Sequence, residues 1–353
     1  MFALPARDGG LGILSPMATA DDEYDHSRSA TAPLVLLITE QNTTIDSAKS
    51  DTVAKQLKSA KNDVISTKRR QQIINRDVLN NRLEDKQLKR QHQELCHRGS
   101  STWLTTLPLA EHSFNLNKQD FRDALALRYL LPMKEIPMNC ACGHKNDIEH
   151  CLSCPLGGYV YLRHNSIRDV TANLLQMTRC KNIQIEPPLL PLTVEVFQYK
   201  STITANDARL DIGATGVWSP MMKTLCDIRV FNSLAPSNAS LSVEDALRKH
   251  EQEKIRAYGE RVLQVEKCAF SPLIFSTNGV MGPEAEKFYS QIARLISLKT
   301  KQSYSDSIRY IRQRLSFSLL KTIIVSRRGF RGTKTTRVTD ETDYNLLYIT
   351  DYC

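Results

Sequence analysis

A short stretch rich in cysteine and histidine constrains the fold of this chain more than any other feature. Its four candidate ligands have the spacing C-x-C-x7-H-x3-C and are Cys140, Cys142, His150 and Cys154. Zinc prefers such thiolate and imidazole ligands, and four protein ligands close a structural site. Clustered free cysteines are the alternative explanation, and His144 or Cys151 could replace one of the four. The spacing predicts a structural zinc site within a knuckle at 139–158.

Two aspartates follow the cysteine cluster, each in an otherwise apolar, strand-like segment. Asp211 lies in ARLDIGATG and Asp227 in KTLCDIRVFN. A carboxylate in an apolar strand is costly unless it is paired or bound to a metal. If the two strands are neighbours, these residues could hold Mg²⁺, which takes one or two protein carboxylates. Glu186, which closes a predicted strand at 183–186, is a third possible ligand. Ordinary salt bridges are the alternative.

Basic residues flank both aspartates. Arg229 shares a strand face with Asp227, because side chains two residues apart point the same way. Lys249 and Lys254 on the next predicted helix could supply a lysine to the same place. A further polar cluster, on a helix predicted over 163–177, could bind phosphate or be an ordinary helix surface; its members are Arg163, His164 and Arg168.

The order of the predicted elements favours an α/β domain. From residue 163 the patterns indicate helix, three strands, helix, strand and two helices, which is typical of a central mixed sheet flanked by helices. Residues 45–98 lack Pro and Gly and predict one long charged helix or a helix pair, whereas 21–41 predict short helical pieces. The expected regions are helical 1–98, a helical connector 99–138, the knuckle 139–158, the α/β domain 159–332 and a flexible tail 333–353.

The charge of the 353-residue chain favours a polyanionic partner. The net charge is +9, and residues 55–98 hold twelve Lys and Arg against five Asp and Glu. Such a basic helix could lie along a nucleic-acid backbone or simply be a solvated surface. No secretion signal is evident, and the longest apolar run, 33–38, is too short to cross a bilayer. We therefore expect an intracellular, soluble protein with no membrane partner.

Several segments together resemble the C-terminal region of non-LTR retrotransposon proteins that carry a restriction-enzyme-like endonuclease. They are CACGHKNDIEHCLSCPLGG, RHNSIRD, RLDI, CDIRV and RKHEQEKIRAY, and LPARDGGLGILSP is similar to the segment after a reverse-transcriptase palm. The resemblance implies a structural zinc, Mg²⁺ held by Asp211 and Asp227, and a scissile phosphate facing Lys249 or Lys254. It also implies DNA as a partner, with element RNA as a second candidate, and a nuclear location for a functional protein.

The chain departs from that family pattern in three ways. Arg-Leu-Asp replaces Arg-Pro-Asp at Asp211, and Arg229 stands where a lysine is common. The chain also has no Tyr-x-Asp-Asp motif, so no reverse-transcriptase active site is expected. Three hypotheses stay open: a Mg²⁺-dependent endonuclease that nicks a DNA target, an inactive nucleic-acid-binding module, and a decayed element fragment. An HNH nuclease built on His164 lacks a suitable second histidine.

Overall fold

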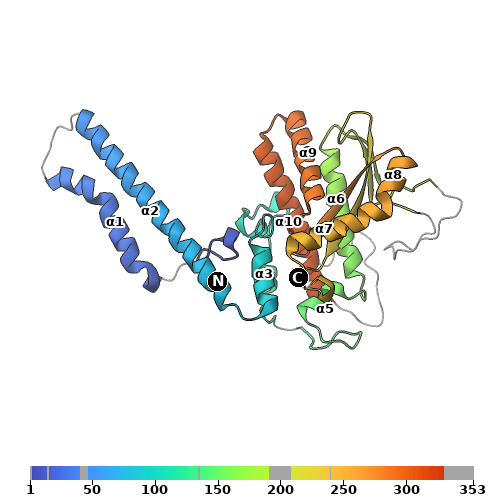
Figure 1. The fold of residues 1–353 in the computed structure, drawn as a ribbon, viewed down its shortest axis with the longest axis horizontal. Helices are drawn as coiled ribbons and strands as arrows, with labels where there is room; N and C mark the ends of the chain where they lie inside the picture. Colours follow the sequence, from blue (N-terminus) through green and yellow to red (C-terminus); the bar gives the residue numbers. More distant parts are fainter. Residues whose placement is uncertain are drawn as a thin grey trace. The chain divides into compact units, whose positions relative to one another are not determined.

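The chain folds as two units, Met1–Cys96 and His97–Cys353, coloured from blue to red in Figure 1. The computed structural model describes residues 2–13, 16–39, 47–133, 136–190, 208–238 and 240–329. The tail predicted at 333–353 lies outside these residues.

The first unit is helical. It contains the long helices α1 (Pro16–Thr39) and α2 (Ser47–Arg82), the shorter α3 (Lys86–Leu95) and a 3-10 turn, Ala6–Asp8. An ion pair of 2.8 Å between Lys68 and Glu23 joins α2 to α1. Gly10 is required where the chain crosses itself, because an added Cβ would lie 1.8 Å from the Leu4 carbonyl oxygen.

The structure decides the two predictions made for this unit, which concern residues 45–98 and 21–41. The charged segment is a helix pair, because α2 ends at Arg82 and Asp85 caps the start of α3 by accepting bonds from two backbone N–H groups. The short pieces expected over 21–41 are instead part of the single helix α1, which continues through Pro33. Residues 40 and 41 lie outside the described part.

The second unit contains a sheet with helices around it. Its helices are α4 (Lys118–Arg128), α5 (Ile148–Ser153), α6 (Tyr159–Gln176), α7 (Val243–Lys254), α8 (Glu260–Gln264), α9 (Pro283–Thr300) and α10 (Tyr304–Arg328). Its strands are β1 (Lys181–Ile185), β2 (Ile212–Thr215), β3 (Lys223–Phe231) and β4 (Ala269–Ser276). The short 3-10 turns are Trp103–Thr105, Ala110–His112 and Pro236–Asn238.

The four strands form one mixed sheet in the order β1-β2-β3-β4. The pairs β1–β2 and β2–β3 are antiparallel, and β3–β4 is parallel, as the crossover through α7 and α8 requires. Alternate residues of β3 point to opposite faces. Ile228 packs into the core built with α6, α9 and α10, whereas Leu225 and Phe231 pack toward α8 and α7. Asp227 therefore faces the side of the sheet that α7 covers.

This architecture confirms the predicted fold class: a helical N-terminal region, a four-stranded mixed sheet with flanking helices, and a Cys3His cluster. No helix in the described ranges is long and apolar enough to cross a membrane.

Two predicted elements are shorter than expected. The strand over 208–216 is regular only at β2, so Asp211 directly precedes it. The helix predicted after the three strands begins at a cap formed by Ser242, which accepts from the Asp245 N–H, but a π-helical turn at Ile255–Gly259 separates α7 from α8. This turn contains Gly259, a poor helix former, and π-turns arise as local bulges inside helices.

Candidate metal centre and acidic site

The four cysteine and histidine ligands converge at the loop around α5. The ligand atoms of Cys140, Cys142, His150 and Cys154 all lie within 4.8 Å of one another. Cys140 and Cys142 each have Sγ at 4.0 Å from the Sγ of Cys154. A tetrahedron with zinc–sulfur bonds of about 2.3 Å has sulfur atoms about 3.8 Å apart, so the cluster could bind a structural zinc.

Local turns bring the ligands together. Gly143 has φ of 90°, which allows the sharp turn after Cys142. Asp147 then caps α5 by accepting the His150 N–H at 2.8 Å, which fixes the start of the helix that carries this ligand. His144 is a neighbour rather than a member of the cluster: its ring stacks on His150, with centroids 5.4 Å apart.

The cysteine thiols have unequal proton affinities. Burial opposes ionisation of Cys140, but hydrogen bonds from the Cys142 N–H and from His150 outweigh it and lower the Cys140 pKa to about 6. Burial raises the pKa of Cys154. A thiolate is the form that binds metal, so these two shifts make Cys140 more ready than Cys154 to bind zinc.

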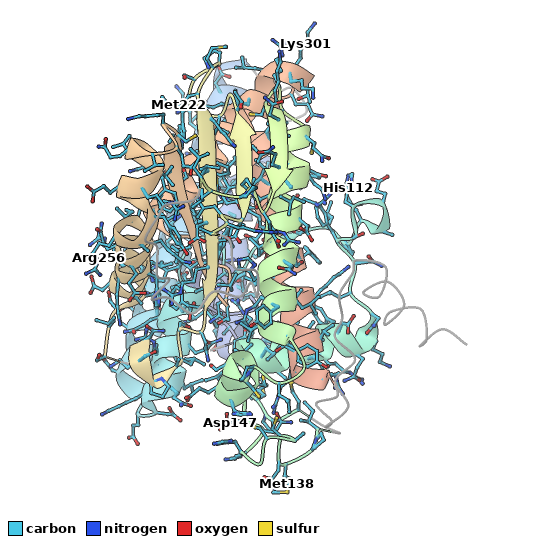
Figure 2. All side chains as sticks on the ribbon, turned by 90° about the vertical axis from the view of Figure 1, so that its right-hand side faces the viewer. His112, Met138, Asp147, Met222, Arg256 and Lys301 are labelled. Carbon is cyan, nitrogen blue, oxygen red and sulfur yellow. The ribbon has the colours of Figure 1, made fainter. Side chains whose placement is uncertain are left out.

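The sheet domain holds the knuckle through its short helix α5. The Arg163 guanidinium on α6 donates to the Leu152 carbonyl at 3.1 Å, and Ser326 on α10 donates to the Cys151 carbonyl at 3.1 Å. Asn232, just beyond β3, donates to the Glu149 carbonyl at 3.3 Å. The metal cluster is thus tied to the elements that carry the acidic residues. Figure 2 labels Met138 and Asp147 at this end of the unit.

Asp211 directly precedes β2, Asp227 lies in the neighbouring strand β3, and backbone contacts join the two segments. The Asp211 N–H donates to the Cys226 carbonyl at 3.0 Å. Its Oδ2 accepts the Ile228 N–H at 2.5 Å, which belongs to the peptide directly after Asp227. Both aspartates are buried, with 5% and 6% of their surface exposed.

Each of these carboxylates has one cationic partner. His164 on α6 places Nε2 at 3.2 Å from Asp211 Oδ2. Lys254, the last residue of α7, places Nζ at 2.5 Å from Asp227 Oδ2. The two pairs are close enough to act on one another electrostatically, since the Asp211 and Asp227 charges interact and Lys254 acts on both carboxylates.

The proton affinities of these groups follow from burial and charge. Burial raises the Asp227 pKa to about 6, with the Asp211 charge adding to the effect and Lys254 opposing it. For Asp211, burial is outweighed by His164 and by the Ile228 N–H, so its pKa is lowered. For His164, burial is outweighed by the Asp211 carboxylate, so its pKa is raised. The geometry favours a charged Asp211–His164 pair beside a carboxyl at Asp227 that takes up protons readily.

The side chains of three other predicted site residues contact neither aspartate within the described residues. Arg229 is bound by Glu253 on α7, at 2.5 Å. Lys249 is exposed on α7 and forms no ion pair within the described residues. Glu186 is paired at 2.5 Å with Arg168 of α6, although its backbone N–H donates to the Asp211 carbonyl.

The three predicted nucleic-acid-binding residues lie in different surroundings. Arg163 is only 2% exposed, so its expected contact with nucleic acid does not fit; burial lowers its pKa to about 10, and it serves the knuckle instead. His164 belongs to the acidic site. Arg168 binds Glu186 and Asp169, so its charge is already paired.

Glu253 binds the predicted residue Arg229, and Asn232 helps to hold the knuckle, but neither was predicted from the sequence. Glu253 joins Arg229 to His250, whose Nδ1 lies 3.3 Å from the same Oε2. Its position three residues after His250 was a usable helical signal. No pattern distinguished Asn232 from other polar residues at strand ends.

The comparisons with known proteins do not assign a family. No protein-family model matches the chain, and no curated protein matches it significantly.

Proposed function

We propose that this protein is a Mg²⁺-dependent DNA endonuclease of the restriction-enzyme-like kind, derived from a non-LTR retrotransposon. One observation carries the proposal: Asp211, directly before β2, and Asp227 in β3 are both buried, and Asp211 accepts the N–H of the peptide that follows Asp227. Buried carboxylates need cations nearby, and His164 and Lys254 lie beside these two. Carboxylates are also the donor type that Mg²⁺ takes.

The side chains present are of the chemical type that binds a magnesium ion. Asp211 and Asp227 would hold it, and the bound ion would polarise the phosphate and help to form hydroxide from water. His164 keeps Asp211 ionised and oriented. Lys254 reaches the same place from α7, and its ammonium group can offset charge that develops on a phosphate.

The lysine function falls to Lys254 in this proposal. Arg229 occupies the strand position where a lysine was expected, but Glu253 binds its guanidinium. Lys249 is exposed and forms no ion pair in the part of the chain that the structure describes. Lys254 already contacts Asp227. The helix therefore supplies the cation that the strand does not.

Nicking of supercoiled plasmid tests the proposal. Zinc-loaded protein should nick in Mg²⁺ and not in EDTA, and Asp211→Asn or Asp227→Asn should each lower the rate by about a hundredfold or more. Glu260→Gln removes an exposed carboxylate from the neighbouring helix α8 and should leave the rate unchanged. Folded, zinc-loaded protein that binds DNA without nicking it would replace the enzyme proposal with the inactive binding module.

A further inference from the structure

The loop between β2 and β3, residues 216–222, exposes large apolar side chains. Met221 is 90% exposed, Met222 44% and Trp218 40%. Exposed methionines in sequence are uncommon on a surface otherwise rich in charge, and they can mark a contact surface. The acidic pair does not use them.

The base of this loop is fixed by specific contacts. Val217 is buried, and its carbonyl accepts a bond of 2.9 Å from the Gln291 side chain. The Trp218 indole N–H donates to Ser271 Oγ at 3.3 Å, and its ring lies edge-on to Phe288. The loop therefore presents its two methionines from a rigid support.

Basic residues surround the loop. Lys181 and Lys223 are both register partners of Thr215, the last residue of β2. A Cβ added at Gly216 would lie 3.8 Å from the Cα of Cys180, which places the loop beside the exposed Arg179.

Two further lysines come from the end of α9. Lys299 Nζ contacts the Thr178 carbonyl at 2.7 Å, next to Arg179. Figure 2 shows Lys301 at the same end of the unit as Met222. Of these basic residues, Arg179, Lys181 and Lys301 form no ion pair within the described ranges. An acidic residue, Glu266, lies nearby as well, since it and Lys223 both act on the Cys268 thiol.

We propose that this loop is a second DNA contact, in which the basic residues bind backbone phosphates and Met221 and Met222 press between or against base pairs. Lys and Arg supply the phosphate contacts, and apolar side chains such as Met can unstack a base step. The inference rests on the proposed function, because it makes double-stranded DNA the partner of the same two strands that carry the acidic pair.

The geometry sets the distance between the two contacts. Met222 precedes Asp227 by five residues of extended strand, or roughly 17 Å at about 3.3 Å per residue. Base pairs rise by about 3.4 Å, so the loop would contact the duplex roughly five base pairs from the acidic site. The knuckle lies at the other end of the unit, near Met138 and Asp147 (Figure 2).

Double-stranded DNA fits this surface better than a membrane or a protein. Membrane-surface binding uses a long amphipathic helix with a continuous apolar face, whereas here two methionines project from a strand loop. An obligate protein interface requires a larger apolar area. A few exposed apolar side chains beside several basic residues suit a deformed duplex, because the basic residues can bind phosphates while the apolar side chains contact unstacked bases.

The test measures DNA binding without cleavage, so that it stays distinct from the nuclease test. Asp227→Asn protein without Mg²⁺ is titrated onto a 30-base-pair duplex that contains 2-aminopurine, and affinity and fluorescence are recorded at several salt concentrations. Binding should raise the fluorescence through base unstacking. Adding Met221→Ser and Met222→Ser should abolish the rise and weaken binding severalfold. Adding Lys181→Gln and Lys223→Gln should instead lower the salt slope by about 2.

Matched variants control for composition. Met17→Ser removes a methionine that is 96% exposed in the first unit, and Lys118→Gln with Arg122→Gln removes two exposed charges on α4. Loop variants that behave like these controls would overturn the proposal, as would a duplex whose fluorescence never changes. Loss of binding to phosphatidylserine vesicles, with unchanged duplex binding, would assign the loop to membranes instead. A fluorescence rise that depends on Met221 and Met222, in native protein that does not nick DNA, would support this inference and refute the nuclease proposal.

Discussion

Replacement of Lys254 by Met should destabilise the His97–Cys353 unit by an amount that grows with pH. Removal of one partner of a buried ion pair commonly costs about 3–5 kcal/mol. That range is too large here, because Asp227 can take up a proton instead of staying charged and unpaired. The loss in the free energy of unfolding therefore cannot exceed the free energy that ionisation of Asp227 contributes in the native protein, apart from other contacts of Lys254.

The Asp227 pKa sets this limit. With a folded pKa of about 6, ionisation contributes about 1 kcal/mol at pH 7, about 3 kcal/mol at pH 8 and almost nothing at pH 5. The sign follows from linkage: a carboxyl with a raised folded pKa favours the folded state at low pH, and that advantage is lost as pH rises through the folded value. Loss of Lys254 raises this pKa further. A constant part of about 0.5–1 kcal/mol comes from the cation–π contact of Lys254 with Tyr258.

Urea unfolding followed by tryptophan fluorescence measures the effect. The two tryptophans of the chain, Trp103 and Trp218, both belong to this unit, so the signal is local. Zinc-loaded protein without Mg²⁺ is compared at pH 5, 7 and 8, with Lys118→Met as an exposed control. Equal losses at pH 5 and pH 8, or a loss beyond about 4 kcal/mol at pH 7, would refute the reasoning.

Four further predictions follow from named contacts. Cys142→Ser should lower zinc affinity by about tenfold or more, measured by competition with a chromogenic chelator; unchanged affinity would contradict the cluster. His164→Gln should remove stability that is present at low pH and lost as pH rises through the raised pKa of His164. His250→Gln should relieve a penalty that appears as pH falls below about 6.5, because burial and then Arg229 lower the His250 pKa. Parallel pH profiles of the two variants would refute these assignments. Ser242→Ala should cost about 1 kcal/mol in urea unfolding through loss of the α7 cap, and Ser240→Ala should cost nothing comparable.

The sequence was informative wherever local pattern decides structure. The metal cluster is encoded within fifteen residues, Cys140–Cys154, so short loops must bring the ligands together. The strands around Asp211 and Asp227 were readable because both segments are apolar and end in turn residues. Their antiparallel pairing then follows from the short connection between them.

The partners of the charged residues were not readable in this way. Lys249 and Lys254 are five residues apart, or about 140° around a helix of 3.6 residues per turn, so only one can face the sheet. The helix phase that selects Lys254 depends on packing. Tertiary contacts also decide that Arg163 is buried and that Arg229 pairs with Glu253. The spacing of residues in the sequence does not reveal such contacts.

The charges at the acidic site bear on how metal and DNA would bind. Asp211 and Asp227 are matched by His164 and Lys254, so the buried group is near neutrality when both cations are protonated. A bound divalent cation would then bring surplus positive charge, which a phosphate could offset. If the proposed site takes Mg²⁺, metal and DNA should therefore strengthen each other's binding, by an equal factor in each direction. Mg²⁺ titrations of Lys254→Met protein with and without duplex should show weaker coupling than native protein; equal coupling would argue against Lys254 as the residue that links the two ligands.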